Sequence, residues 1–396
     1  MGEGGQGMGG RGLGLVTALT VVMAVAVPTA PAAPAPAAAP PPKAVSIAAG
    51  AEFTCALMTT GGVKCWGDNW SGQLGDGTWN DRGTPVPVWR LSSGVVVLAT
   101  GSRYACVLVT NGKVKCWGWN TYGQLGYKGY WANTPVGVSH LPSGVTGIAA
   151  GDGHTCALMS WGGVKCWGDN YFGQLGDGTS QERHIPGNVS GLWSGAVAIS
   201  AGGHHTCALM ATGGVKCWGY NGQGQLGTGG TKSSRATPVP VKGLSSGVTA
   251  VSAGGYHTCA LMESGGVTCW GRNDHGQLGD GTTRQSTTPV AVQGLSSGVM
   301  AVSAGYEHTC ALLATGGVKC WGRNYYGQLG IGNLEEKHTP VGVLHLSSGV
   351  AAVSAGWFHT CALMVTGRAW CWGLNDSGQL CIGNKWSSFD PEKVIF

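Results

Sequence analysis

The chain has 396 residues, of which 10% are charged, and its 23 basic and 18 acidic side chains give a net charge of +5. Glycine supplies 73 positions, about 18% of the chain by division, where an average protein has about 7%. This composition excludes an acidic disordered chain, a collagen and a coiled coil, and without a run of Lys or Arg to neutralise a row of phosphates the sequence predicts no nucleic-acid partner.

Residues 1–32 are predicted to be a secretory signal peptide. Leu13–Val27 is an apolar run of 15 residues followed by small residues, shorter than the roughly 20 that span a bilayer and typical of an export signal. An uncleaved anchor is the alternative, because Arg11 is the only basic residue before the run. Residues 33–43 are rich in Ala and Pro, which favours an extended linker. We therefore expect a secreted protein with no membrane span after the signal is cleaved.

Residues 44–396 consist of seven copies of one unit of about 51 residues. The tripeptide Cys-Trp-Gly marks the copies and begins at Cys65, Cys116, Cys166, Cys217, Cys269, Cys320 and Cys371. A fixed period near 50 residues is typical of a propeller or a solenoid, and a unit with one long loop is large for a solenoid coil. The sequence therefore predicts an all-β fold, a seven-bladed β-propeller with four antiparallel strands per blade.

The fifth unit shows the four expected strands. They are Val248–Ala253, Thr258–Met262, Val267–Gly271 and Thr288–Val292. Short runs of β-branched and apolar residues between glycine-rich turns are typical of strands. A proline at the start of the fourth strand suits an outer edge, where a missing N–H donor costs little. The sequence leaves open whether the blades follow these units or are offset by one strand.

Each unit carries one Cys-x9-Cys pair that we predict to be a disulfide. In a hairpin whose turn is centred on residue 60, Cys55 lies directly opposite Cys65, with Cβ atoms about 4.5–5.5 Å apart. Export makes oxidation possible. Zinc is the alternative, but its cysteine clips are closer in sequence, so no metal is expected. The pairs are Cys55 and Cys65, Cys106 and Cys116, Cys156 and Cys166, Cys207 and Cys217, Cys259 and Cys269, Cys310 and Cys320, and Cys361 and Cys371.

Cys381 is the fifteenth cysteine and has no partner in this scheme. It takes the place of a glycine that the other six units have after Gly-Gln-Leu. Two alternatives remain open, a buried free thiol and a site of intermolecular linkage or reactivity.

The repeated strings His-Thr-Cys-Ala-Leu and Gly-Gly-Val-Lys-Cys-Trp-Gly-x-Asn-x-x-Gly-Gln-Leu-Gly resemble the regulator-of-chromosome-condensation repeat family over Val45–Phe396. The resemblance implies a seven-bladed propeller, and the cysteine pairs are similar to those of exported bacterial members. One such member inhibits a β-lactamase through aromatic loop residues on one face. The nuclear member exchanges guanine nucleotide on a small GTPase, which a secreted chain would not meet, and it binds chromatin, for which this sequence has no basic tail. Plant ultraviolet-B photoreceptors repeat Gly-Trp-Arg-His-Thr, which only residues 356–360 approach, with Phe358 in place of Arg.

In an antiparallel meander, the loops after the first and third strands of every blade share one face. The residues at these positions differ among the seven copies. Most of the aromatic ones lie in units six, seven, one, two and three, which are neighbours round a ring. Exposed aromatic residues are common anchors for protein partners, although stacking on sugars and simple packing of the loops are alternatives. The predicted partner-binding residues are Trp70, Trp79, Tyr122, Tyr130, Trp131, Tyr171, Phe172, Tyr325, Tyr326, Trp357 and Phe358.

Residues repeated in every unit are expected to be structural. The tryptophans of Cys-Trp-Gly are predicted to pack between blades, and the histidines before Thr-Cys to form hydrogen bonds in the core. Phe53 and Tyr104 replace this histidine in units one and two. Asp76, Asp177 and Asp280 lie in Gly-Asp-Gly-Thr turns and are expected to cap them through side-chain to backbone bonds.

The sequence contains no nucleophile elbow, phosphate-binding loop or His-Glu-x-x-His motif. We therefore expect a non-enzymatic protein without a cofactor: a secreted propeller that binds a protein of unknown identity, in the sharpest version an inhibitor of a secreted enzyme. The alternatives are binding of carbohydrate or cell wall, a structural surface module and, by family analogy, guanine-nucleotide exchange.

Overall fold

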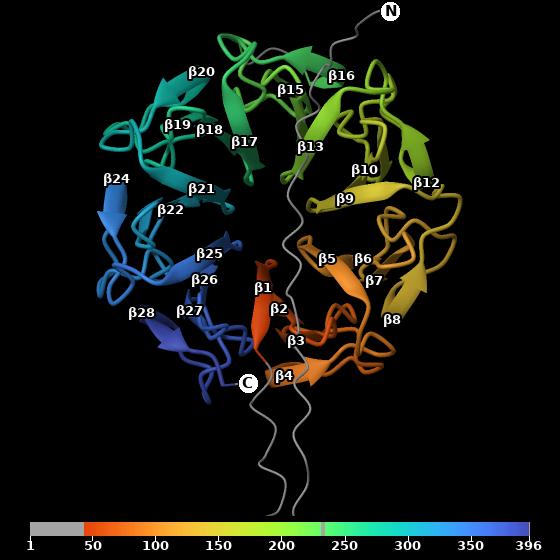
Figure 1. The fold of residues 1–396 in the computed structure, drawn as a ribbon, viewed down its shortest axis with the longest axis horizontal. Coiled ribbons are helices and arrows are strands. Elements are labelled where there is room, and N and C mark those ends of the chain that lie inside the picture. Colours follow the sequence, from red (N-terminus) through yellow and green to blue (C-terminus); the bar gives the residue numbers. More distant parts are fainter. Residues whose placement is uncertain (1–42, 231–233, 396) are drawn as a thin grey trace, which may run out of the picture. The chain divides into compact units, whose positions relative to one another are not determined.

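The computed structural model describes residues 43–230 and 234–395, which contain β-strands and no helix. The strands form seven four-stranded antiparallel sheets, each made of four consecutive strands, arranged as the blades of a ring (Figure 1). The all-β seven-bladed propeller predicted from the repeat is thus confirmed. The predicted signal peptide and all of the linker except Lys43 lie outside the described residues.

The strands of blades one to four are β1 (Ala44–Ala49), β2 (Phe53–Met58), β3 (Val63–Gly67), β4 (Arg82–Pro87), β5 (Val95–Thr100), β6 (Tyr104–Val109), β7 (Val114–Gly118), β8 (Ala132–Gly137), β9 (Val145–Ala150), β10 (His154–Met159), β11 (Val164–Gly168), β12 (Arg183–Asn188), β13 (Ala196–Ala201), β14 (His205–Met210), β15 (Val215–Gly219) and β16 (Arg235–Pro240). Those of blades five to seven are β17 (Val248–Ala253), β18 (His257–Met262), β19 (Val267–Gly271), β20 (Ser286–Ala291), β21 (Val299–Ala304), β22 (His308–Leu313), β23 (Val318–Gly322), β24 (Lys337–Gly342), β25 (Val350–Ala355), β26 (His359–Met364), β27 (Ala369–Gly373) and β28 (Ser388–Lys393).

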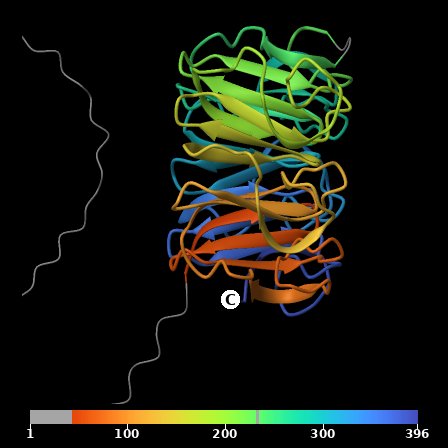
Figure 2. The ribbon, with the colours of Figure 1, turned by 90° about the vertical axis from the view of Figure 1, so that its right-hand side faces the viewer.

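The first strand of each blade lies nearest the central channel and the fourth lies at the outer edge (Figure 1). The strands run between two faces of the ring (Figure 2). The loops after the first and third strands share what we term the upper face, where the Asp68 N–H donates to the Glu52 carbonyl at 2.9 Å. The lower face carries the hairpin turns between the second and third strands and the connections between blades.

The blades follow the sequence units without an offset. Ring closure between blades seven and one therefore exchanges no strand. The fourth strands begin earlier than predicted: β20 spans Ser286–Ala291 instead of Thr288–Val292. The reason is that Ser286 already pairs with Gly271, whereas the Val292 N–H has left the strand and donates to the Val267 carbonyl at 3.0 Å. Pro289 consequently lies within β20. Because β20 is the outermost strand of its blade, the missing N–H of this proline costs little.

The seams between blades contain the hydrophobic cores. Each repeated tryptophan is fully buried and donates its indole N–H to the carbonyl of the Gln in the preceding blade's Gly-Gln-Leu loop, at 2.8–3.0 Å. Trp117 accordingly packs in one cluster with Leu74 and Val88 of blade one. The closing seam is built identically, because Trp66 donates to the Gln379 carbonyl. The predicted packing of these tryptophans between blades is confirmed.

The repeated histidines also join neighbouring blades. The Nε2 atoms of His154, His205, His257, His308 and His359 lie 2.8–2.9 Å from the threonine hydroxyl of the next blade. Burial is the main cause that lowers their pKa values, to about 3 for four of them and about 4 for His359. The histidines are therefore neutral at physiological pH, and the predicted hydrogen-bonded structural role is confirmed.

The seven cysteine pairs form seven disulfides, one inside each blade. Cys55 lies directly opposite Cys65 in the β2–β3 ladder, and the Cα atoms of every pair are 4.1 Å apart. Cys381 is a buried free thiol. Disulfides in every blade fit an oxidising, extracellular environment.

Candidate upper-face binding site

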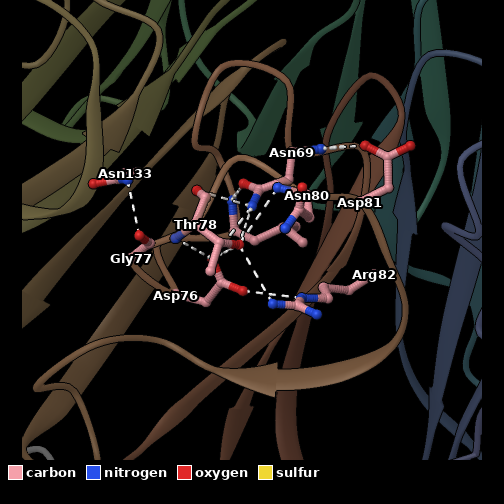
Figure 3. Close-up of polar contacts among 9 residues, drawn as sticks. Asn69, Asp76, Gly77, Thr78, Asn80, Asp81, Arg82 and Asn133 are labelled. Atoms are coloured by element: carbon pink, nitrogen blue, oxygen red, sulfur yellow. Dashed lines mark hydrogen bonds and ion pairs between the residues drawn. The ribbon is translucent and has the colours of Figure 1, made fainter.

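The long upper loops are held in shape by one repeated asparagine. In blade one, Asn69 Oδ1 accepts the Leu74 N–H at 2.9 Å, while Nδ2 donates to the Thr78 carbonyl at 3.1 Å and to Asp76 Oδ1 at 3.2 Å (Figure 3). Asp76 also accepts the Thr78 N–H at 2.9 Å and pairs with Arg82 at 3.1 Å. The expected capping role of Asp76 and its two counterparts is confirmed, since all three accept the N–H of the threonine two residues later. The loops are therefore rigid supports for the side chains they carry.

A continuous series of rings crosses the upper face from blade three to blade seven. Centroids of neighbouring rings lie 4.6–6.2 Å apart, within the range of favourable aromatic contacts. Both upper loops contribute, so that the ring from one blade's third-strand loop touches the first-strand loop of the next blade. We term this series the aromatic chain; it comprises Tyr171, Phe172, His204, Tyr220, Tyr256, Tyr306, Trp357, Phe358, Tyr326 and Tyr325.

Two arginines support the aromatic chain between blades five and seven. Glu307 is buried, and Arg272 Nη1 donates to its Oε1 at 2.6 Å while Arg323 Nη1 donates to its Oε2. The guanidinium of Arg272 lies 5.9 Å from the Tyr256 ring centroid, and that of Arg323 lies 5.8 Å from the Phe358 centroid. These contacts fix the rings in place, as charge-assisted and cation–π interactions do.

The inner edge of the aromatic chain borders the mouth of the central channel. A pocket of about 110 Å³ is lined there by Asp152 of blade three, Tyr306 of blade six and Trp357 of blade seven, among small residues of the first strands. Asp152 is partly buried, and its carboxyl group lies close enough to the Trp357 side chain for that side chain to lower its pKa. Burial, with a smaller contribution from Asp169, raises the pKa of Asp152 to about 7. A carboxyl group next to two aromatic rings suits a cationic group, which would hold it ionised.

The predicted partner-binding residues divide into two groups. All six predicted residues of blades three, six and seven belong to the aromatic chain. The two ends of the aromatic chain are its most exposed members: 76% of Tyr171 and 65% of Tyr325 is accessible. The residues of blades one and two contact other partners: Trp70 lies 5.4 Å from Trp131 and Tyr122 lies 5.2 Å from Trp119, measured between ring centroids. Trp79 and Tyr130 are exposed.

The aromatic chain therefore follows a different arc from the expected one. The sequence predicts aromatics over blades six, seven, one, two and three, whereas the ring contacts run through blades four and five. The residues missed are His204, Tyr220, Tyr256 and Tyr306. Three of them occupy the variable positions after the first strand, and Tyr220 directly follows Cys-Trp-Gly. A comparison of the residue after Cys-Trp-Gly among the seven units identifies Tyr220 in unit four, together with Arg272 and Arg323 in units five and six.

Within residues 43–230 and 234–395, no group of three or more His, Cys, Asp or Glu side chains is arranged to hold a metal ion. In the same part of the chain, no helix is long and apolar enough to cross a membrane.

Comparison with known proteins identifies two matching family models. The RCC1-like domain matches residues 90–395, and the regulator of chromosome condensation (RCC1) repeat matches residues 44–73. The ultraviolet-B receptor UVR8 of Arabidopsis thaliana is 33% identical over 360 residues, covering 89% of this chain and 70% of UVR8. The probable E3 ubiquitin-protein ligase HERC4 of Homo sapiens is 34% identical over 223 residues, covering 55% of this chain but 21% of HERC4.

Solved structures give the same fold. Human WBSCR16 superposes with a TM-score of 0.76 at 25% identity, covering 85% of this chain and 94% of that one. Prp20p from Saccharomyces cerevisiae, studied with its binding to Gsp1p and histones, superposes with a TM-score of 0.75 at 22% identity, covering 89% of this chain and 88% of that one. The second likeness concerns the fold alone.

Proposed function

The chain belongs to the family of RCC1-like domains, and we propose that it is an exported member that binds another protein through the upper face of its propeller. The observation that carries the proposal is the aromatic chain, a fixed series of rings that ends in two exposed tyrosines. Tyrosine and tryptophan supply large contact areas at little cost in side-chain entropy, which is why they dominate binding hot spots. The predicted export signal and the disulfide in every blade support binding outside the cytoplasm.

The channel mouth suggests where a partner would be anchored. A lysine or arginine side chain from the partner, placed against the Tyr306 and Trp357 rings at the channel mouth, would reach the Asp152 carboxyl group. The aromatic chain would lie beside this anchor and exclude water from it, an arrangement that strengthens a charged contact. A partner presenting a basic side chain within an apolar surface fits these features.

Inhibition of a secreted enzyme is the sharpest form of this proposal. An inhibitor must cover its target with a preformed surface, and the asparagine-braced loops supply one that loses little entropy on binding. The names of the relatives describe a photoreceptor and a ligase, and we transfer neither activity to this protein. The photoreceptor repeat has Arg where this protein has Phe358, and the series of rings on the upper face contains one tryptophan, Trp357. We propose a binding protein without catalytic activity of its own.

The test is a pull-down in which the mature protein is immobilised and exposed to the secreted and envelope proteins of its own source. A panel of purified β-lactamases is tested in the same way. A captured protein is identified by mass spectrometry, purified, and its affinity is measured by calorimetry. Tyr171→Ala and Tyr325→Ala are each expected to weaken binding at least tenfold, because both rings are exposed and their removal leaves the core intact. Asp152→Asn is expected to weaken binding of a partner that inserts a basic side chain.

Trp89→Ser is the matched control. Trp89 is an exposed tryptophan in the connection after β4, and blades two and three have Ser at the same position. The control should bind like the wild type. A partner bound equally by all variants, or no captured protein, contradicts the proposed site.

A further inference from the structure

The lower face of blade three differs from that of the other six blades. Trp161 occupies the β10–β11 turn, where the other blades have Thr60, Asn111, Thr212, Ser264, Thr315 and Thr366. Trp193 occupies the connection after β12, where the described counterparts are Ser92, Pro142, Ser245, Ser296 and Ser347. Two small residues have thus become tryptophan in the same blade, and 51% of Trp161 and 63% of Trp193 is exposed to solvent.

The change at Trp161 removes a local stabilising interaction. In four other blades the small polar side chain at this position accepts the N–H two residues later, as Thr60 does from Gly62 at 3.3 Å. An indole cannot accept this hydrogen bond, and an exposed indole gains little from burial. A residue that breaks a local rule without stabilising the fold points to function.

The fold brings the two tryptophans to one groove. The β10–β11 turn lies against the connection after β12, where the Val164 N–H donates to the Leu192 carbonyl at 3.0 Å. Trp161 and Trp193 line a groove of about 60 Å³ whose floor includes Leu192. Gly163 permits the close approach, since a Cβ there would lie 2.5 Å from the Trp161 indole nitrogen and 2.8 Å from the Trp193 carbonyl.

The polar side of the groove carries hydrogen-bond donors. Lys165 Nζ donates to Asn188 Oδ1 at 2.6 Å, and both residues line the groove. The ammonium group keeps further protons and the Asn188 amide keeps its own, so both can donate to a ligand. Asn188 is also peculiar to this blade: its counterparts are Pro87, Gly137, Pro240, Ala291, Gly342 and Lys393.

We propose that this groove binds a pyranose ring of a polysaccharide. A pyranose has apolar C–H faces that pack on indoles and an equatorial rim of hydroxyl oxygens that accept hydrogen bonds, which matches two exposed tryptophans beside a lysine and an amide. A peptide anchor would call for a deeper apolar pocket than one whose lining combines glycine with two polar side chains. The site lies on the opposite face from the proposed protein site, so that the propeller could hold a glycan and a protein at once.

The experiment measures migration of the mature protein through native gels containing one soluble polysaccharide each: a β-glucan, a xylan, a glycol chitin and a polyuronate. We expect retardation by at least one of them, and the polyuronate distinguishes an acidic sugar paired with Lys165 from a neutral one. Trp161→Thr and Trp193→Ser restore residues found in other blades and should each reduce the apparent affinity at least tenfold. Asn188→Gly should reduce it less.

Two controls keep the outcome decisive. Trp89→Ser removes an exposed tryptophan outside the groove and should leave retardation unchanged, as should Tyr325→Ala on the upper face. Thermal unfolding of each variant shows that the fold is retained. Migration unaffected by all four polysaccharides overturns the proposal, as does equal retardation of wild type, Trp161→Thr and Trp193→Ser. If no polysaccharide binds, and the wild type captures a protein that the Trp161→Thr variant does not, the groove binds a peptide and the glycan proposal is wrong. Failure of the upper-face capture experiment leaves this result untouched.

Discussion

Cys381 has the environment of a structural residue although it stands in a glycine position. Its φ of 53° is in the left-handed region, close to the 65–73° of the six glycines it replaces. The side chain is 1% exposed, and Sγ donates to the Ile395 carbonyl at 3.2 Å. Burial is the main cause that raises the pKa of the thiol to about 11. Of the two alternatives from the sequence, the structure favours the buried free thiol, because a reactive cysteine is exposed and has a lowered pKa.

This environment predicts a thiol that does not react in the native protein. At pH 8 the thiolate is a very small fraction and reagents have no access, so a disulfide-exchange reagent such as DTNB should label well under one thiol per chain within minutes. After unfolding in guanidinium without reductant, one thiol per chain should react. Fast labelling of the folded protein would show that Cys381 is accessible and would reopen the linkage alternative.

The seam between blades one and two lacks the histidine–threonine contact that five other seams have. In five seams a histidine meets a threonine of the next blade; here Phe53 stands in place of the histidine and Ala105 in place of the threonine. Phe53 and Ala105 are fully buried in the same hydrophobic cluster. An apolar pair has therefore replaced a hydrogen-bonded pair. At the following seam Tyr104 keeps a polar contact, with Thr155 Oγ1 2.9 Å from its hydroxyl.

The coupled exchange predicts a non-additive double-mutant cycle. Phe53→His should lower the free energy of unfolding by about 2–4 kcal/mol, because apolar burial is lost and a buried ring nitrogen faces Ala105 without a partner. Adding Ala105→Thr supplies the partner and should recover about 1–2 kcal/mol of coupling energy. Urea unfolding of the wild type, both single variants and the double variant measures this. Strictly additive effects would mean that the two positions do not interact.

The elements were predictable to different degrees. Strand number, order and the Cys55–Cys65 register follow from the period and from the symmetry of a tight hairpin, because each is a property of one unit. The start of β20 was missed because pairing with Gly271 begins before the run of β-branched residues. The path of the aromatic chain was missed for a different reason: Tyr220 meets Phe172 and Tyr256 across seams between blades, and comparing units one at a time does not reveal such neighbours.

The whole ring contains five buried neutral histidines, so its stability must depend on pH. Their folded pKa values lie far below the ordinary value of about 6.5, which an unfolded chain would have. As the pH falls below that value, the unfolded chain takes up protons that the folded ring excludes, and stability is lost progressively down to the folded pKa values. Three carboxyl groups, those of Glu52, Asp68 and Asp152, act in the opposite direction, because burial raises their pKa values and so favours the folded state as the pH falls. Burial also lowers the pKa of His204, which adds to the effect of the five histidines.

Mild acid should therefore destabilise the propeller. At pH 5.5 each histidine is expected to cost about 1.4 kcal/mol relative to pH 8. Urea unfolding with the disulfides intact, at pH 7.5, 6.5 and 5.5, should show a urea midpoint that falls as the pH is lowered. His154→Tyr, which introduces the residue that blade two has at this position, should reduce the pH dependence by the equivalent of one proton. A midpoint that does not change between pH 7.5 and 5.5 would contradict neutral histidines at the seams.

The closing seam has a consequence for the connectivity of the chain. All seven disulfides lie within blades, so blades seven and one are joined by non-covalent contacts alone, and these repeat the contacts of the other seams. The six connections between blades hold the two ends at a high effective concentration, which allows a seam of ordinary strength to stay closed. The position of the chain break is then arbitrary in physical terms. A circular permutant with its ends joined by a short linker and a new break in any other connection would keep every seam and every disulfide of the ring.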